Sequence, residues 1–312
     1  MRILVLGAGA VGGYFGGRLV EAGRDVTFLL RPHRAAQIAR QGLILESPVG
    51  NATLPVKVAT DGSAAIGSDV VILACKAYDL ETAIAAIEKP VQAGAVVLPL
   101  LNGLAHIDRL RRAFGQERVI GGMCQILATL SSDGTVRHLD KGARLVYGRF
   151  AEQIERQSLA VLMEKLDRIF TDVNFTAKRG EPIERSLWDK WLMLATLAAA
   201  TSLMRGSIGQ IMASDDGAKL IGGILAETVS VARAAGYPPS EAYLETVRRI
   251  VLEPGSPAKA SLLRDIEKGG RIEGAHLIGD MLRRAQAFGL ETPLLQVANC
   301  HLQVYEANLQ PS

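Results

Sequence analysis

The chain has 312 residues, of which 48% are hydrophobic, 21% charged and 5% aromatic, a balance typical of a globular protein with room for two domains. A net charge of +3 is too small to indicate binding to nucleic acid or to a membrane surface, and we expect neither partner. The three cysteines are far apart and form no CxxC pair, so we expect no disulfide and no metal site.

The first half of the sequence alternates short apolar runs with amphipathic stretches. These patterns predict strands at residues 2–6, 25–30, 69–74, 95–100, 119–130 and 136–147, with a β-rich stretch at 43–58. They predict helices that end at residue 21 and that span residues 33–41, 80–87, 107–114 and 159–170. Strands alternating with helices favour an α/β domain with a doubly wound, mostly parallel sheet.

After Pro182 only helical patterns follow, at residues 183–203, 216–235, 240–252, 258–268 and 272–288. We interpret Gly289, followed by Pro293, as a helix-stop signal. The sequence therefore predicts an α/β domain over residues 1–182 and an all-α domain over residues 183–312.

A glycine-rich motif follows the first predicted strand and opens the first helix; it consists of Gly7, Ala8, Gly9, Ala10, Val11 and Gly12. Gly7 permits a tight turn, Gly9 lets a pyrophosphate approach the backbone, and Gly12 allows the helix to pack closely. The free N–H groups of the helix N-terminus attract phosphates. We predict that these six residues bind a dinucleotide in a Rossmann-type domain.

The end of the second strand indicates which dinucleotide is bound. NAD-binding chains usually place an acid there for the ribose 2′-OH, but this chain has Arg31 and no acid at that point. A guanidinium can bind the 2′-phosphate of NADP through paired charge-assisted hydrogen bonds, and Arg34 stands close enough to assist. The alternative is that Arg31 only ends a surface strand. We expect NADP(H) as the cofactor.

Lys190 is a charged residue in apolar surroundings, in Leu-Trp-Asp-Lys-Trp before an apolar run through Met204. Desolvation lowers the pKa of such a lysine and makes it a better acid, which carbonyl reduction requires. The alternative, from the sequence around Lys190 alone, is that its charged end reaches solvent. We expect Trp188 and Trp191 to pack in the core.

The sequence resembles the ketopantoate reductase (2-dehydropantoate 2-reductase) family over nearly its whole length. The matching stretches are GAGAVGGYFGGRL, the strand end at Arg31, VILACKAYD, LLNGL, LWDKW, SLLRDIEKGGRIEGAHLIGD and GLETP. The resemblance implies a helical substrate and catalytic domain similar to that of 6-phosphogluconate dehydrogenase. It also implies NADPH-dependent reduction of a small-molecule 2-oxo acid to a 2-hydroxy acid, in pantothenate biosynthesis.

The resemblance also implies roles for five residues. Lys190 matches the general acid, and Glu273 matches its acidic partner, although Glu273 by sequence alone would be a solvated helix residue. Ser261 matches the serine that binds the substrate carboxylate. Lys76 and Asn102 match residues beside the nicotinamide ribose and the substrate, and both follow predicted strands, where ligands bind in open α/β sheets.

Three positions depart from the family's pattern. Asparagines usually stand four and eight residues after the catalytic lysine, where this chain has Leu194 and Ala198, and Ile208 replaces a later polar position. Each lost partner costs a hydroxyl-bearing substrate roughly 1–3 kcal/mol. We expect reduction of 2-dehydropantoate to pantoate, with a more apolar 2-oxo acid or a non-catalytic NADPH sensor as alternatives. His276 is a candidate replacement contact, the alternative being an ordinary helix histidine.

The apolar start is broken by glycines and lacks a cleavage-type site, so it does not indicate a secretory signal. No uncharged apolar run reaches the roughly 18 residues of a membrane span. We expect a cytoplasmic protein, and apolar helical surfaces in the second domain are compatible with a homodimer.

Overall fold

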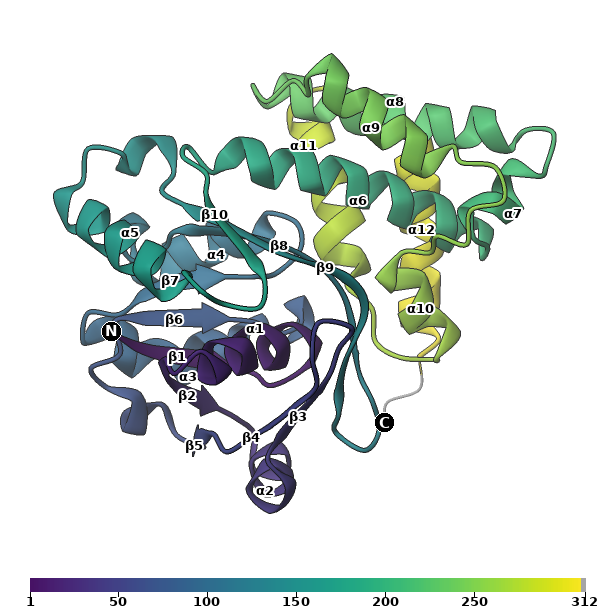
Figure 1. The fold of residues 1–312 in the computed structure, drawn as a ribbon. Helices are drawn as coiled ribbons and strands as arrows, with labels where there is room; N and C mark the ends of the chain where they lie inside the picture. Colours follow the sequence, from purple (N-terminus) through teal and green to yellow (C-terminus); the bar gives the residue numbers. More distant parts are fainter. Residues whose placement is uncertain (310–312) are drawn as a thin grey trace. The chain divides into compact units, whose positions relative to one another are not determined.

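The computed structural model describes residues 1–309, and the chain divides into two compact units. The first unit comprises residues 1–101 and 106–186; the second comprises residues 102–105 and the chain from Leu187 onward. Among the described residues, every strand belongs to the first unit and the second is built from helices (Figure 1). The predicted succession of an α/β region and a helical region is confirmed.

The central sheet of the first unit is parallel and five-stranded, in the order β5-β2-β1-β6-β7. Its strands are β1 (Arg2–Leu6), β2 (Asp25–Leu29), β5 (Lys57–Ala59), β6 (Val70–Leu73) and β7 (Val96–Pro99). Side chains alternate between two cores: Ile3 and Val5 lie in one, Leu4 and Leu6 in the other. Burial on both faces explains the continuous apolar runs of these strands.

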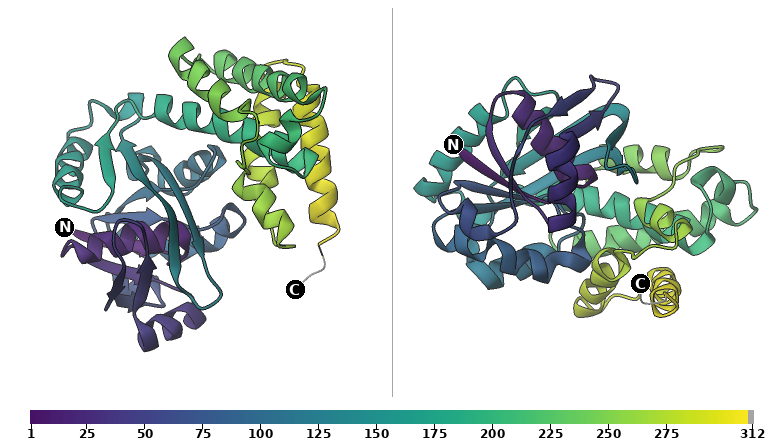
Figure 2. Two further views of the ribbon diagram at one scale, coloured as in Figure 1. Left: turned by 45° about the vertical axis from the view of Figure 1, so that its right-hand side comes forward. Right: turned by 90° about the horizontal axis from the view of Figure 1, so that it is seen from below.

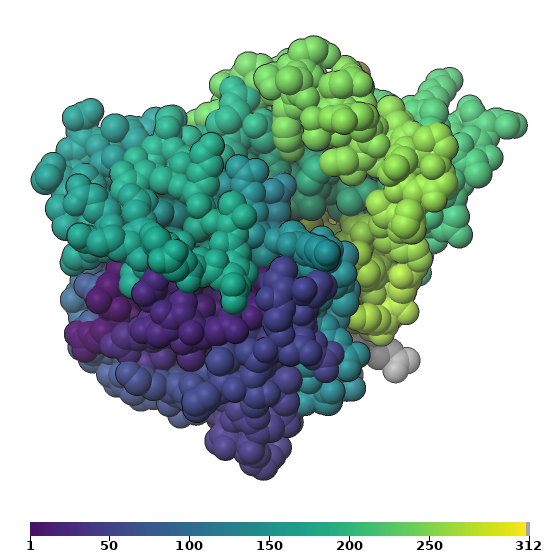
Figure 3. Space-filling model, in the orientation of Figure 1, coloured from purple at the N-terminus to yellow at the C-terminus, as the bar shows by residue number. Residues whose placement is uncertain are grey.

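Five helices accompany this sheet: α1 (Ala10–Glu21), α2 (Pro32–Gln41), α3 (Leu80–Gln92), α4 (Ala105–Phe114) and α5 (Gln157–Ile169). Helix α1 covers one face, and α3 and α4 contribute to the core on the other face. Helix α2 buries only Ile38 and projects from the surface of this unit (Figure 3).

A second sheet, which the sequence did not predict, completes the first unit. It contains β3 (Leu43–Glu46), β4 (Ala52–Leu54), β8 (Gly121–Leu130), β9 (Val136–Gly148) and β10 (Thr176–Arg179). Strands β8 and β9 form an antiparallel hairpin, whereas the sequence pattern placed both in one mostly parallel sheet. The five-residue connection between them is too short for a parallel crossover, which needs a dozen residues or more.

Helix α1 lies between the two sheets and approaches both closely. A Cβ atom on Gly16 would come within 2.7 Å of the Phe28 ring in β2. A Cβ atom on Gly17 would come within 2.9 Å of Leu45 in β3. Such distances are shorter than carbon–carbon contact permits, so the glycines set how closely the sheets pack on the helix.

The second unit contains α6 (Glu184–Met204, beginning in the first unit), α7 (Ile208–Met212), α8 (Gly217–Ala234), α9 (Glu241–Val251), α10 (Ser261–Glu267), a π-helix η5 (Ala275–Gly279), α11 (Asp280–Ala287) and α12 (Pro293–Ala307) (Figure 2). The single helix predicted at 272–288 is therefore a π-helical turn continued by α11. Gly289, with φ +68°, follows α11, but Pro293 begins α12 rather than ending a helix. Proline is favoured in the first helical turn, where its missing N–H needs no partner. None of the described helices is long and apolar enough to cross a bilayer.

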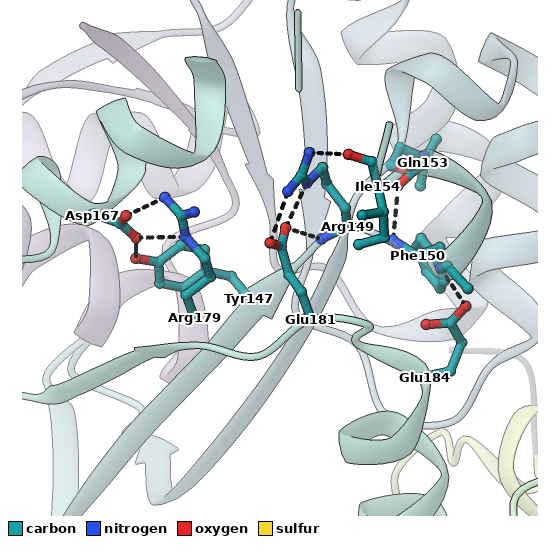
Figure 4. Close-up of polar contacts among 11 residues, drawn as sticks. Tyr147, Arg149, Phe150, Gln153, Ile154, Asp167, Arg179, Glu181 and Glu184 are labelled. Atoms are coloured by element: carbon teal, nitrogen blue, oxygen red, sulfur yellow. Dashed lines mark hydrogen bonds and ion pairs between the residues drawn. The ribbon is translucent and has the colours of Figure 1, made fainter. Parts of the chain in front are cut away.

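A largely buried ion pair joins the end of β9 to the segment that precedes α6 (Figure 4). Arg149 Nε and Nη2 donate to the two carboxylate oxygens of Glu181 at 2.7 and 3.0 Å, and the Arg149 backbone N–H donates to the same carboxylate at 2.9 Å. The two side chains are only 10% and 14% exposed. Burial opposes ionisation of Glu181, but the hydrogen bonds from Arg149 outweigh it and hold the pKa of Glu181 below its usual value.

Glu181→Gln is expected to lower the free energy of unfolding by about 3–5 kcal/mol at neutral pH, because it leaves the Arg149 charge buried without a counter-charge. The matched control is Asp25→Asn in the exposed Lys57–Asp25 pair, which should cost less than about 1 kcal/mol.

Since folding lowers the pKa of Glu181, the stabilisation that Glu181 provides is present above the unfolded-state pKa and is lost as pH falls through the folded-state pKa. Denaturant unfolding at neutral and at acidic pH should therefore show the deficit of the variant shrinking in acid. Equal stability of variant and wild type at neutral pH would contradict this assignment.

Candidate functional site

The glycine-rich loop between β1 and α1 has the shape of a phosphate cradle. Gly7 has φ +95°, and a Cβ atom on Gly12 would lie 2.2 Å from the Gly7 carbonyl oxygen. Nothing lies within 4 Å of a Cβ atom placed on Gly9, so this side of the loop is open. Gly9 is also the N-cap of α1, with no side-chain cap and no acid in the first turn. A pyrophosphate group therefore fits at this helix N-terminus.

Arg34, on α2, contacts the same loop. Its Nε donates to the Ala8 carbonyl at 3.1 Å, and its Nη1 donates to Gln37 Oε1 at 2.7 Å. Its Nη2 is buried and has no hydrogen-bond partner among the described residues. Burial also lowers the pKa of Arg34. A positive charge with incomplete compensation beside the loop favours an anionic ligand there.

Arg31 ends the β2 segment and is the N-cap of α2, with a side chain 70% exposed. Its Nη2 lies 2.9 Å from Oδ1 of Asp79, whose side chain is 25% exposed. Asp79 closes the short helix η2 (Ala77–Asp79), which follows Lys76 at the end of the β6 segment. Arg31 and exposed Lys76 thus follow the carboxyl ends of two strands of one parallel sheet, the edge where ligands bind. Sequence reasoning missed Asp79, because it comes from a distant segment.

In the second unit, Lys190 and Asn102 are joined by a hydrogen bond. Lys190 Nζ, on α6, donates to Asn102 Oδ1 at 2.8 Å. Asn102 is followed by Gly103, whose φ is +77°. A Cβ atom on Gly103 would lie 3.3–3.5 Å from atoms of His276, so this turn packs against η5. Lys190, Asn102 and His276 therefore come from three different segments to one place.

His276 lies in the π-helix, a geometry that is frequent at functional sites. Burial lowers the pKa of His276, against the opposing effects of the Glu273 charge and of a hydrogen bond with the Asn102 backbone. Glu273 is half-buried directly before this helical segment, rather than solvated. The Trp191 Nε1–H donates to the Leu277 carbonyl at 3.2 Å, which ties α6 to η5.

The Trp188 and Trp191 rings are 5% and 1% exposed, with ring centroids 5.1 Å apart. The prediction that this pair packs in the core is confirmed.

Ser261 is the first residue of α10 and lies near a different part of α6. The preceding N–H, of Ala260, donates to Thr201 Oγ1 at 3.4 Å. Thr201 stands 11 residues after Lys190, about 16 Å along the helix axis. The structure thus joins Lys190 to Asn102, places the Asn102 turn against His276 near the charge of Glu273, and connects the start of α10 to the far half of α6.

Leu194, Ala198 and Ile208, the three apolar residues at positions that are usually polar in the family, differ in their exposure. Leu194 and Ala198 follow Lys190 at intervals of four residues and so share its face of α6. Ala198 is 2% exposed and Ile208 is fully buried, whereas Leu194 is half-buried. Of the three, Leu194 alone keeps accessible surface on the lysine's side of the helix.

An open groove of about 980 Å³ lies elsewhere in the first unit, along β9 and β10. Its lining includes Lys141, Arg144 and Lys178 but none of the predicted site residues. In residues 1–309, no three His, Cys, Asp or Glu side chains gather in a way that could hold a metal ion. The candidate active-site residues are therefore those of the cradle in the first unit and of the Lys190 cluster in the second.

Comparison with known proteins identifies the family. The model of ketopantoate reductase PanE/ApbA matches residues 3–152, and the model of its C-terminal region matches residues 182–306. The uncharacterized oxidoreductase YkpB of Bacillus subtilis is 36% identical over 308 residues, which cover 98% of this chain and 99% of YkpB.

Two solved structures have the same fold. The 2-dehydropantoate 2-reductase of Geobacter metallireducens GS-15 is 28% identical, with a TM-score of 0.86 over 97% of this chain and 99% of its own. A D-mandelate dehydrogenase, solved with NADH and anilino(oxo)acetate, is 20% identical, with a TM-score of 0.84 over 99% of each chain. From the two family matches, which span most of the sequence, we conclude that the chain belongs to the ketopantoate reductase PanE/ApbA family of oxidoreductases.

Proposed function

We propose that the chain reduces a 2-oxo acid to the corresponding 2-hydroxy acid with NADPH, and that Lys190 is the general acid. The observation that carries this proposal is the 2.8 Å hydrogen bond between Lys190 Nζ and Asn102 Oδ1. The nicotinamide, when bound, supplies a hydride to the carbonyl carbon. Negative charge then develops on the carbonyl oxygen, where an ammonium group stabilises it and donates a proton.

Asn102 gives the lysine a defined direction. An ammonium group has three N–H donors on a flexible stem, and Asn102 Oδ1 engages one of them. We propose that the same ammonium group donates to the carbonyl oxygen of a substrate when one is bound. We assign Asn102 to positioning Lys190, in addition to the contact with nicotinamide ribose and substrate that the family resemblance implies for Asn102 and Lys76.

His276 and Glu273 supply the remaining polar groups of the cluster. Because burial lowers its pKa, His276 is neutral near pH 7 and can hydrogen-bond a substrate group without adding charge. The charge of Glu273 acts on His276 as well, since it raises the pKa of His276 against the lowering effect of burial. We assign Glu273 to holding the substrate, as the acidic partner of Lys190 that the family resemblance implies, and Ser261 to the substrate carboxylate.

NADPH is proposed as the cofactor because of Arg31. Its side chain is 70% exposed, and its pairing with Asp79 is of the weak, solvent-exposed kind that a 2′-phosphate can replace. The open cradle at Gly9 takes the pyrophosphate, and Arg34 adds positive charge beside it.

We propose 2-dehydropantoate as the substrate, since the Geobacter relative is named for that reaction. The apolar surface of Leu194 supports a second candidate, a more apolar 2-oxo acid. A protein named for D-mandelate has the same fold, so the fold itself does not restrict the acid.

Lys190→Ala is expected to lower kcat by about 10²- to 10⁴-fold, the usual contribution of a general acid, while the Kd of NADPH stays within about threefold. Steady-state NADPH oxidation and a nucleotide titration measure the two quantities. Lys219→Ala, which removes an exposed lysine of α8, is the matched control and should leave both unchanged. Turnover of Lys190→Ala within twofold of wild type would remove Lys190 from this role.

Leu194→Asn places an amide one helical turn after Lys190. It should raise kcat/KM for 2-dehydropantoate about tenfold relative to 3,3-dimethyl-2-oxobutanoate, which is the same acid without the hydroxyl group. Met204→Asn, at the exposed end of α6, is the control and should not change this ratio. A ratio that is unchanged or lower in Leu194→Asn would show that the substrate hydroxyl does not face position 194.

A further inference from the structure

An acid and an arginine meet where the adenosine ribose of a dinucleotide binds in this type of fold. In Rossmann domains an acid near the end of β2 accepts from the ribose 2′-OH of NAD, whereas an arginine accommodates the 2′-phosphate of NADP. The sequence around β2 supplies only the arginine, Arg31. The structure brings a carboxylate to the same point from the turn after β6, with Asp79 Oδ1 2.9 Å from Arg31 Nη2.

We propose that Asp79 determines the cofactor preference, as the group that the 2′-phosphate of NADPH displaces from Arg31 and as the acceptor for the ribose 2′-OH of NADH. This inference rests on the proposed function, in which Arg31 faces the adenosine ribose. In addition, Asp79 reduces the preference for NADPH over NADH that Arg31 alone would give.

The exposure of the pair makes the exchange feasible. The Arg31 side chain is 70% exposed and Asp79 is 25% exposed, so solvent screens their attraction and the arginine can change partner. A phosphate that reaches Arg31 carries more negative charge than the carboxylate and offers more acceptor oxygens. The carboxylate left beside it repels the phosphate, which weakens NADPH binding but not NADH binding.

Asp79 has a second partner available once it leaves Arg31. It is the N-cap residue of α3, a position where aspartate side chains usually accept from the N–H groups of the first turn. Its side chain makes no such capping bond in this structure and pairs with Arg31 instead. The N–H of Leu80 already donates to the Ala77 carbonyl, so the N–H groups of the next two residues of the first turn are the donors that a displaced carboxylate would bind.

Glu81 provides a matched control on the same helix. It stands two residues beyond Asp79, is 69% exposed, and accepts two hydrogen bonds from Arg109 at 2.7 and 2.5 Å. Glu81→Gln therefore removes one negative charge from the first turn of α3 without changing the partner of Arg31.

The test compares the Kd values of NADPH and NADH for the wild type, Asp79→Asn, Glu81→Gln and Arg31→Ala, by fluorescence titration of the full chain at low ionic strength. Asparagine has a similar size and an equal preference for the N-cap, so the fold should be kept, as thermal unfolding will show. Asp79→Asn should tighten NADPH by roughly 3- to 10-fold and weaken NADH by about threefold. Glu81→Gln should change the ratio of the two Kd values by less than about twofold. Arg31→Ala should weaken NADPH far more than NADH.

The outcomes separate this inference from the proposed function. An unchanged Kd ratio in Asp79→Asn, together with loss of NADPH preference in Arg31→Ala, overturns the role of Asp79 and leaves the cofactor site as proposed. Equal weakening of both nucleotides by Arg31→Ala overturns the 2′-phosphate contact and the inference with it. The same titrations with 2′,5′-ADP and 5′-AMP, which carry no nicotinamide, should show the same change in the ratio of the two Kd values in Asp79→Asn. An unchanged ratio for these two ligands would contradict a role of Asp79 at the adenosine end.

Discussion

The close packing of α1 between two sheets is the constraint on which the first unit depends. Gly16 and Gly17 leave no room for side chains against β2 and β3, and Gly12 leaves none against the Gly7 carbonyl. The distance of the helix from both sheets is therefore fixed. Its N-terminus, which no side chain caps, lies at the carboxyl edge of the central sheet. Arg31 and Lys76 follow strands that end at this edge, so the packing that builds the core also positions the residues proposed to bind the cofactor.

The second unit concentrates polar chemistry within a largely apolar setting. Lys190, Asn102 and His276 come from three segments, and the apolar residues of α6 continue the face on which the lysine lies. Hydrogen bonds and charges act more strongly where water is scarce, which suits the stabilisation of charge on a carbonyl oxygen. Burial lowers the pKa of His276, against the raising effects of the Glu273 and Asp280 charges.

Features encoded locally could be predicted from the sequence, and features that depend on distant segments could not. Apolar runs and glycine spacing predicted β1, β2, β6 and β7 of the central sheet and the glycine-rich turn, because these are properties of a few adjacent residues, whereas β5 was not predicted as a strand of that sheet. The pairing of β8 with β9 and the approach of Asp79 to Arg31 depend on tertiary structure. Pro293 is ambiguous in sequence, since proline both follows helices and begins them, and here it begins α12. The roles of Glu273 and Ser261 came from the family resemblance alone; the structure adds that Glu273 lies beside His276.

The proposed function requires that the cradle and the Lys190 cluster serve one reaction, the reduction of a 2-oxo acid by NADPH. Its most direct test is the rate of NADPH oxidation by the wild-type chain with a panel of 2-oxo acids, from 2-dehydropantoate to more apolar ones, with identification of the product. We expect turnover of at least one acid, with one 2-hydroxy acid formed for each NADPH oxidised. Tight binding of NADPH with no turnover of any acid in the panel would contradict it and would favour a protein that binds the nucleotide without catalysis.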